Sequence, residues 1–264
     1  HSTIRPLSYD NVWNRRLSRQ SNNVKVDEEW DWILKTRSKT VLISFGSFML
    51  SKDMRLEYKK ALARAMATFP EVTFIWKYES DDTTSFAQGI KNIHFPKWIP
   101  QTALLGDSRL LAFFTHGGLG SVNEVSYLGK PSVLCPIFAD QMRNAKMLAR
   151  HNESIEISKY ELADSNKIEE VFRNILFDKS YRLASETLAL QLANQPVKPK
   201  ELLVRHAEFA ARFGRLPSLD PFSRHMSFIE YFLIDIAFVG LISLLLISFV
   251  LFLITKRTFT GNEK

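Results

Sequence analysis

Cysteine is nearly absent from the sequence, and its absence removes one class of stabilising bond. Cys135 is the single cysteine among 264 residues, so no disulfide can form within the chain. The cysteine count leaves the redox compartment undetermined. Residues 133–136 have the composition of a short apolar strand. We therefore expect the thiol to be a buried packing group and not a nucleophile.

Dense runs of basic residues are also missing. The formal net charge is +7 and the pI is about 9.4, values that would permit a nucleic-acid partner. However, no cluster of lysine and arginine with interleaved aromatic side chains occurs, so we predict no nucleic-acid partner. The excess charge is better interpreted as a solvated basic surface with some attraction for anionic nucleotides.

A third absence is that of a group of residues spaced as metal ligands. Glu79, Asp81 and Asp82 fall in a polar turn over residues 79–84, and acidic pairs of this kind suggest a metal site. No histidine or further carboxylate is spaced to complete a site around them. We therefore interpret the turn as a solvated loop and predict neither a metal nor another cofactor.

Long hydrophobic runs are absent except for one near the C-terminus. Residues 236–254 contain no charged side chain. A helix of this length spans about 28 Å at a rise of 1.5 Å per residue, close to the thickness of the hydrocarbon layer. We predict a single transmembrane helix here, because a buried core helix of such uniformity is much rarer.

The charges beside this run favour one orientation in the membrane. Basic residues follow it directly and acidic residues come shortly before it (Lys256, Arg257; Glu230, Asp235). Under the positive-inside rule, this arrangement predicts a cytosolic tail and a lumenal domain.

Glycine is scarce, yet two glycines stand together in the stretch around which the chain is organised. Residues 110–114 are a continuous apolar run of strand length, and Gly117 and Gly118 follow shortly after. Apolar residues then recur at helical spacing over residues 119–128, until Gly129 ends the helix. A helix N-terminus beside glycines has unpaired N–H groups and a positive dipole end, which together suit a phosphate. This pattern predicts a diphosphate-binding junction.

Polar side chains near this junction predict a nucleotide. His116 can donate to a phosphate oxygen, and Ser121 adds a hydroxyl group in the first helical turn. Glu124, one turn later, could accept hydrogen bonds from the two hydroxyls of a ribose. Upstream, Trp98 and Gln101 lie three residues apart around a proline. This pairing suits stacking on a base and hydrogen bonding to its edge.

Structural roles compete with these assignments. A tryptophan in an apolar stretch is usually a core residue, and a lone histidine is more often a satisfied structural residue. For Trp98 the following proline and Gln101 reverse that preference. For His116 the two glycines that follow it have no core role at that position.

Two further strand-to-helix junctions carry candidate site residues. Asp140 and Gln141 open a helix and could point into the same crevice, although Asp140 could instead cap that helix. Ser47 follows the strand predicted over residues 41–46. It too could cap a helix, here the one predicted over residues 52–68. Both interpretations of Ser47 stay open.

The stretch from residue 94 to 144 resembles the signature of the UDP-glycosyltransferases, the family that includes glucuronosyltransferases. The resemblance is highly specific because many residues match at fixed spacing: Trp98, Pro100, Gln101, Leu104, Leu105, Thr115, His116, Gly117, Gly118, Ser121, Glu124, Gly129, Pro131, Pro136, Phe138, Ala139, Asp140, Gln141 and Asn144.

The resemblance implies an α/β fold, namely the Rossmann-like C-terminal domain of a two-domain GT-B enzyme, followed by the single transmembrane helix. It also implies a role for each residue of a UDP-sugar site. Uracil would stack on Trp98, Gln101 would hydrogen-bond the base or the ribose, and Glu124 would accept from the ribose hydroxyls. The phosphates would be held by His116 and Ser121 beside Gly117 and Gly118, with Ser47 close to them. Asp140 and Gln141 would bind the sugar. One position departs from the pattern: many members have asparagine where this chain has Gly120, so one phosphate contact is replaced by backbone or lost.

The elements outside the signature complete the predicted domain. Further strands are predicted over residues 72–76, 93–95, 133–136 and 154–157, and further helices over residues 26–34, 164–178, 179–194 and 199–214. The predicted organisation is a linker over residues 1–24, a UDP-sugar-binding domain with C-terminal helices over residues 25–225, a membrane-spanning segment with its lead-in over residues 226–254, and a tail over residues 255–264.

The resemblance implies transfer of a hexosyl or glucuronosyl group from a UDP-sugar to small lipophilic acceptors, with this chain supplying the donor-binding half. It places the residues that activate the acceptor in an N-terminal domain outside this sequence, so we assign no catalytic residue and expect the chain alone to be inactive.

The alternative is a non-catalytic membrane-anchored subunit that binds a UDP-sugar and pairs with a separate acceptor-binding chain. A nucleotide-binding isomerase of the same fold is disfavoured by the membrane helix and by the motif from Trp98 to Gln101. The expected location is the membrane of the endoplasmic reticulum.

Overall fold

A computed structural model of the chain describes residues 26–261. The contacts within it divide the chain into two units, one ending at Pro196 and the other beginning at Val197, and each is described by itself. The linker predicted over residues 1–24 lies outside the described residues. The predicted end of the UDP-sugar-binding domain at residue 225 stays a prediction.

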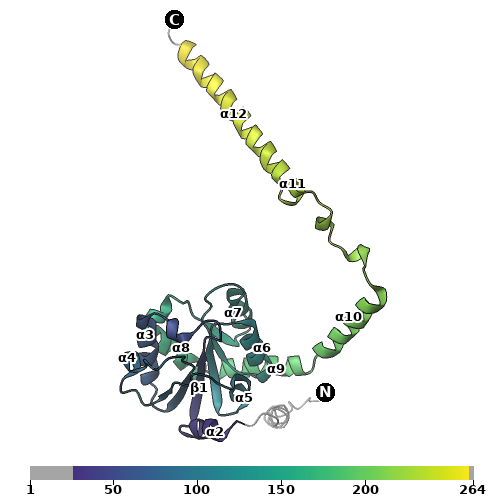
Figure 1. The fold of residues 1–264 in the computed structure, drawn as a ribbon. Helices are drawn as coiled ribbons and strands as arrows, with labels where there is room; N and C mark the ends of the chain where they lie inside the picture. Colours follow the sequence, from purple (N-terminus) through teal and green to yellow (C-terminus); the bar gives the residue numbers. More distant parts are fainter. Residues whose placement is uncertain (1–25, 262–264) are drawn as a thin grey trace, which may run out of the picture. The chain divides into compact units, whose positions relative to one another are not determined.

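The first unit is built on one parallel sheet of six strands (Figure 1). Their order across the sheet is β3-β2-β1-β4-β5-β6, and every neighbouring pair is parallel. The strands are β1 Lys39–Ser44, β2 Val72–Trp76, β3 Ile93–His94, β4 Leu110–Thr115, β5 Ser132–Leu134 and β6 Ser154–Glu156. All six predicted strands are confirmed, with ends that differ by at most two residues.

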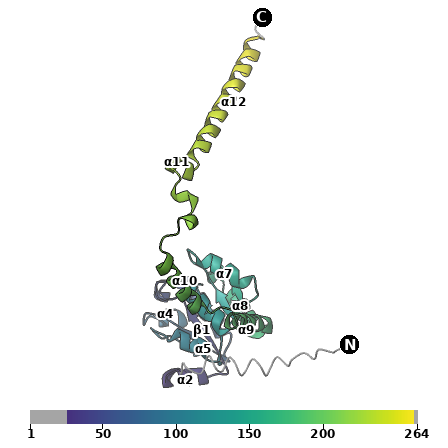
Figure 2. The ribbon, with the colours of Figure 1, turned by 90° about the vertical axis from the view of Figure 1, so that its right-hand side faces the viewer.

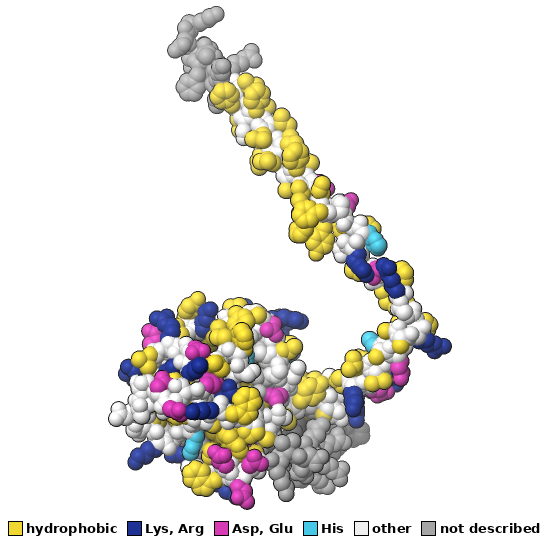
Figure 3. Space-filling model, in the orientation of Figure 1, with side chains coloured by type: hydrophobic (Ala, Val, Ile, Leu, Met, Phe, Trp, Pro, Cys, Tyr) yellow, Lys and Arg dark blue, Asp and Glu magenta, His cyan; other side chains and the backbone are white. Residues whose placement is uncertain are grey.

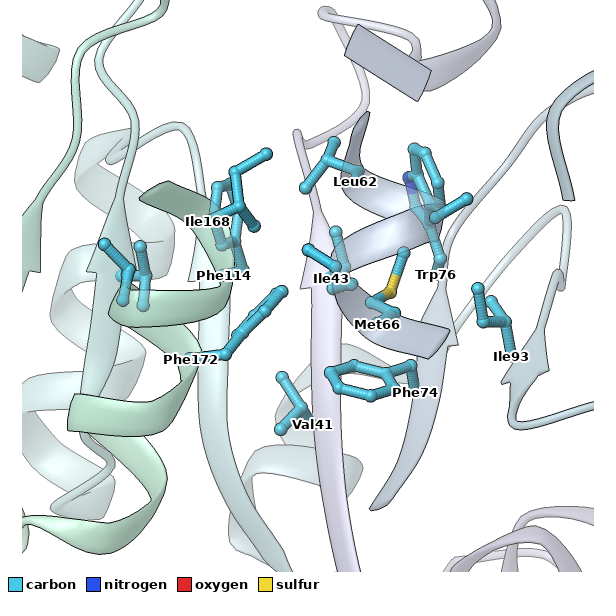
Figure 4. Packing of buried hydrophobic residues seen from close by; sticks show 14 of the residues in the cluster. Val41, Ile43, Leu62, Met66, Phe74, Trp76, Ile93, Phe114, Ile168 and Phe172 are labelled. Carbon is cyan, nitrogen blue, oxygen red and sulfur yellow. The ribbon is translucent and has the colours of Figure 1, made fainter. Parts of the chain in front are cut away.

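Helices cover both faces of this sheet, as the two hydrophobic clusters of the core show. One cluster joins the sheet to α3 Leu56–Ala67, α4 Thr84–Ala87 and α8 Ser165–Phe177, and Figure 4 shows part of it. The other joins the opposite face to α2 Glu28–Lys35, α5 Gln101–Gly106, α6 Leu119–Leu128 and α7 Gln141–Ala149. In Figure 1, α3, α4 and α8 lie on one side of the sheet and α5 and α6 on the other, and Figure 2 shows the same chain turned by 90°. The predicted α/β class is therefore confirmed.

The central strand β1 shows why its sequence is almost entirely apolar. Val41 and Ile43 pack into one cluster while Leu42 packs into the other, so successive side chains serve opposite faces. The chain runs outward from β1 to β3 and then returns to β4 on the other side of β1. In an open α/β sheet such a reversal leaves a crevice at the carboxyl ends of the strands, which is where ligands bind.

Two local expectations are confirmed in this unit. Gly129 follows α6 with φ of 64°, a left-handed conformation that ends the helix as predicted. Cys135 is fully buried, and burial raises the pKa of its thiol to about 12. Its role is therefore packing and not nucleophilic chemistry.

A buried carboxyl group lies just before β6, at the end of the sheet opposite to the carboxyl ends of the strands. Glu153 precedes β6 and is only 7% exposed, and among the described residues its Oε2 atom has no hydrogen-bond partner. Burial raises its pKa from 4.5 to about 7. The folded chain therefore holds a proton at pH values where the unfolded chain has released it.

The free energy of unfolding should accordingly fall as the pH rises from about 4.5 to about 7, because the folded state binds more protons over this range. Replacing Glu153 with glutamine should flatten this dependence and stabilise the fold at pH 8 by about 1–3 kcal/mol. Urea unfolding at several pH values measures both effects. The matched control is Glu156→Gln, an exposed neighbour in β6, and equal pH profiles for the wild type and Glu153→Gln would contradict the prediction.

The second unit begins with α10 Pro199–Phe213 and ends with α12 Ile234–Gly261. Before it, α8 and α9 Lys179–Ala193 close the first unit, so the three predicted helices after residue 164 are confirmed. Residues 234–254 of α12 have a mean hydropathy of 2.9, and none of this stretch is buried within the structure. By length and composition it is a helix that could cross a membrane, as predicted.

Candidate functional site

A cavity of about 460 Å³ opens where β1 and β4 end, the point at which the strand order reverses. Its size is that of a site for a small ligand. The lining residues come from the segments that follow β1, β2 and β4, from the loop before α5 and from the first turns of α6: Ser44, Gly46, Ser47, Phe48, Lys77, Trp98, Ile99, Gln101, His116, Gly118, Leu119, Gly120, Ser121 and Glu124. Seven of the ten predicted site residues are among them, namely Ser47, Trp98, Gln101, His116, Gly118, Ser121 and Glu124.

The imidazole of His116 is held closely against two glycines. A Cβ atom added to Gly118 would lie 2.7 Å from Nε2 of His116, and one added to Gly46 would lie 2.9 Å from its Cε1. No side chain larger than hydrogen fits at either position while the ring stays in place. The loops after β1 and β4 therefore approach one another with the ring between them.

His116 is expected to be neutral at neutral pH. Burial lowers its pKa below the ordinary value of 6.5, and the carboxylate of Asp140 opposes this shift. Nδ1 of the ring lies 3.3 Å from Oγ1 of Thr115, a fully buried residue at the end of β4. A neutral imidazole donates through only one ring nitrogen, so the ring can offer one N–H to an anion.

The N-terminus of α6 forms one wall of the cavity. Gly118 is its N-cap residue and makes no side-chain capping bond, and within residues 26–261 no side chain is seen to accept from the N–H groups of the first turn. The first N–H to bond back within the helix is that of Val122, to the Gly118 carbonyl at 3.0 Å, which leaves the preceding N–H groups available to a ligand. A Cβ atom added to Gly120 would meet nothing within 4 Å, so the space beside this glycine is open.

A hydrogen-bonded group connects α5 to α6 at another part of the cavity. The amide nitrogen of Gln101 donates to Oγ of Ser121 at 3.1 Å and to Oε2 of Glu124. The hydroxyl of Thr102 donates to the other carboxylate oxygen of Glu124. Each carboxylate oxygen can accept more than one hydrogen bond, so Glu124 is held in position and can still accept from a ligand.

Trp98 and Lys77 form the side of the cavity nearest β2. The indole of Trp98 is 71% exposed, so the alternative that it is a core residue is wrong. Nζ of Lys77 lies 5.4 Å from the centre of the indole ring, and it donates to the carbonyl of Gly46 at 2.9 Å and to Glu79 at 2.7 Å. Lys77 therefore fixes the loop after β1 in place.

Three predicted site residues, Gly117, Asp140 and Gln141, do not line the cavity. Gly117 has φ of 81°, which favours glycine, and its carbonyl accepts from Nδ2 of Asn144 at 3.1 Å. The same nitrogen donates to Asp140 at 2.9 Å. The side-chain oxygen of Gln141 accepts from the N–H groups of Ile137 and Phe138 at 2.8 and 3.0 Å. These bonds place the start of α7 directly beside the glycine junction, next to the cavity and not in its wall.

Two alternative roles from the sequence are wrong. Asp140 precedes α7 but makes no side-chain capping bond to it. Ser47 does not cap a helix either, because α3 begins at Leu56 after Arg55 as its N-cap, later than predicted. Ser47 instead lies in the turn after β1 and lines the cavity.

Several lining residues are absent from the predicted set, chiefly Ser44, Gly46, Phe48 and Lys77. The hydroxyl of Ser44 accepts from the N–H of Gly46 at 3.2 Å and so shapes the turn. Each of these residues ends a strand or follows one closely, as Lys77 follows β2. The carboxyl ends of parallel strands share one edge of the sheet, and this rule would have found them.

Comparison with known proteins decides the family. The model of the family described as "UDP-glucoronosyl and UDP-glucosyl transferase" matches residues 23–264. The chain belongs to this family. Among similar UDP-glycosyltransferases, human UDP-glucuronosyltransferase 1A4 is 27% identical over 232 residues, covering 88% of this chain and 42% of that protein. Human UDP-glucuronosyltransferase 1A9 is 30% identical over 212 residues, covering 80% and 39%. The chain thus spans less than half the length of these relatives, as expected for a C-terminal half.

Solved structures show that this UDP-glycosyltransferase chain has the fold of half a GT-B enzyme. Phytolacca americana UGT2, complexed with UDP-2fluoro-glucose and pterostilbene, has a TM-score of 0.59 at 22% identity, covering 70% of this chain and 45% of that one. A variant of Os79 from O. sativa in complex with UDP has a TM-score of 0.62 at 19% identity, covering 75% and 48%. The predicted GT-B relationship is confirmed.

Proposed function

We propose that this chain supplies the donor-binding half of an enzyme that transfers a hexosyl or glucuronosyl group from a UDP-sugar to small lipophilic acceptors. One observation carries the proposal: the exposed indole of Trp98, the hydrogen-bonded carboxylate of Glu124 and the N-terminus of α6 all line the same cavity. These three features match the three parts of a nucleoside diphosphate.

The assignment of each part follows from its chemistry. The uracil ring stacks on Trp98, and Gln101 hydrogen-bonds its edge or the ribose. The ribose hydroxyls donate to Glu124. The diphosphate lies at the N-terminus of α6, where the free N–H groups, the neutral His116 and Ser121 donate to its oxygens.

This placement also has a catalytic consequence. When the sugar is transferred, negative charge grows on the departing UDP. Donors fixed before the reaction stabilise that charge without rearranging, and the first turn of α6 holds such donors on a rigid element. The part of this chain in catalysis is then to stabilise the leaving group.

Titration with UDP tests the proposal. Trp98→Ala should weaken UDP binding by about 1–3 kcal/mol, because it removes the stacking surface for the base. Trp32→Ala is the matched control, since Trp32 is also exposed, at 65%, but does not line the cavity. Calorimetry should show a loss for the first variant alone. Equal UDP affinity in a folded Trp98→Ala variant would remove the indole from the site and the proposal with it.

We further propose that α12 anchors the protein in the endoplasmic reticulum membrane, with the sheet domain in the lumen and the tail after residue 255 in the cytosol. The basic residues that follow the apolar run support this orientation. In sealed microsomes, added protease should remove a tag placed after Lys264 and leave residues 26–196 intact. Protection of the tag together with digestion of the domain would reverse the topology.

A further inference from the structure

The chain between α10 and α12 is irregular, and we call residues 215–233 the juxtamembrane segment. It contains two short 3-10 turns, Pro217–Leu219 and Phe222–Arg224, and the single-turn helix α11 Phe228–Tyr231. Leu233 has φ of 55°, a conformation that side chains other than glycine rarely adopt. It interrupts the helical backbone between α11 and α12.

Large apolar side chains in this segment face outward. Phe222 is 78% exposed and Phe228 is 70% exposed. Phe232 packs against Phe228 with ring centres 4.7 Å apart and against Tyr231 at 5.0 Å. Within the unit that holds the segment, nothing described covers these rings. An exposed apolar cluster of this kind marks a surface that contacts something other than water.

The side chains of Arg215, Asp220, Arg224 and Glu230 all have hydrogen-bond partners within the segment. Asp220 accepts from Arg215 at 3.0 Å and from Arg224 at 2.8 Å. Ser227 and Glu230 form a reciprocal capping box at the start of α11. The charges near the rings are therefore largely compensated, which lowers the cost of moving the segment out of bulk water.

The backbone rules out the hydrocarbon core as the surroundings of these rings. Short turns leave N–H and C=O groups without helical partners, and such groups are not tolerated where lipid surrounds them. The apolar surface of α12 begins at Ile234, immediately after the segment, and Figure 3 shows hydrophobic side chains along this helix. The segment is thus too apolar for water, too irregular for the membrane core, and continuous with a helix that could span the membrane.

We propose that the juxtamembrane segment lies in the interface of the bilayer that α12 crosses, with its aromatic rings at the boundary between headgroups and acyl chains. Aromatic side chains favour this region, and interfacial segments bury their apolar side by about 5–10 Å. The partner is the lipid surface itself. The proposal rests on α12 crossing the membrane and is independent of the nucleotide site.

Fluorescence quenching in vesicles of phosphatidylcholine tests the placement. The full chain with Cys135→Ala receives one new cysteine, Ser223→Cys, which carries an environment-sensitive dye and leaves every aromatic residue in place. Lipids with a nitroxide near the headgroup or near the chain end act as shallow and deep quenchers. Leu245→Cys in α12 and Lys60→Cys on the surface of α3 are the controls.

The dye at residue 223 should lose more fluorescence to the shallow quencher than to the deep one, the reverse of residue 245, while residue 60 loses little to either. Adding Phe222→Ala, Phe228→Ala and Phe232→Ala should reduce the loss at residue 223. A dye at 223 that neither quencher reaches places the segment in water or against protein, and preferential deep quenching places it in the core. Either result, or a triple variant without effect, overturns the proposal.

Discussion

Gly118→Ala should destabilise the fold by about 1–3 kcal/mol and strongly weaken UDP binding. The added Cβ atom would lie 2.7 Å from Nε2 of His116, and the other side of the ring is bounded by Gly46. Overpacking of a site that cannot relax has a cost of this size. The backbone at Gly118 is ordinary, with φ of −61°, so the conflict is with the ring alone.

A double-mutant cycle isolates this conflict. In a His116→Ala background, Gly118→Ala should have little further effect on the free energy of unfolding in urea, because the ring is gone. Gly46→Ala is the matched comparison: Gly46 has φ of 88°, so its substitution stays strained even without the ring. Equal costs for Gly118→Ala in both backgrounds would show that the ring does not fill the space between the two loops.

Asp140→Asn should weaken binding of UDP-glucose or UDP-glucuronate while leaving UDP affinity nearly constant. The carboxylate lies beside the glycine junction without lining the cavity, tied through Asn144 to Gly117. There it is badly placed for a phosphate, because like charges repel, but suited to accept from sugar hydroxyls. The expected difference is about 1–3 kcal/mol, or roughly a tenfold change in Kd for each 1.4 kcal/mol.

The comparison needs both ligands and a control carboxylate. Asp81→Asn serves as the control, because this side chain is 86% exposed and lies outside the cavity. Gln141→Ala should not be combined with Asp140→Asn, since it would also leave two backbone N–H groups of the preceding loop unpaired. If UDP and the UDP-sugar weaken together in Asp140→Asn, the carboxylate serves the nucleotide and the assignment to the sugar is wrong.

The sequence was sufficient to predict the helices and strands of the fold, because apolar runs and helix stops are local signals. Strand β2 was predicted with its observed bounds, and Gly129 ended α6 as expected. The start of α3 was wrong, because the residues after Ser47 form a turn and the 3-10 helix Ser51–Asp53 before the helix begins. Nothing in residue spacing distinguishes such a turn from a first helical turn.

The contacts within the site were harder to predict from the sequence, because they join residues far apart in the chain. The bond from Lys77 to Gly46 depends on β2 lying beside β1 in register, which pairs Ile43 with Trp76. Thr102 holds Glu124 only because α5 and α6 meet at the crevice. The sequence predicted seven of the residues that line the cavity, but not the hydrogen bonds that they make.

The pairing of β1 with β4 has a consequence for how the chain folds. It brings Thr40 beside Leu110, although two other strands lie between them in the sequence. The sheet is therefore completed by a contact between residues far apart in the chain. Such contacts form late, since the entropy of closing the loop is lost before the contact contributes. Both walls of the cavity depend on this contact, so the nucleotide that we propose to bind there would find its site only in the completed sheet. At a hundredfold excess over Kd, it would shift the folding equilibrium by about 2.7 kcal/mol. With the proposed binding, the supply of nucleotide around the newly made chain would then influence how much of it reaches the completed sheet.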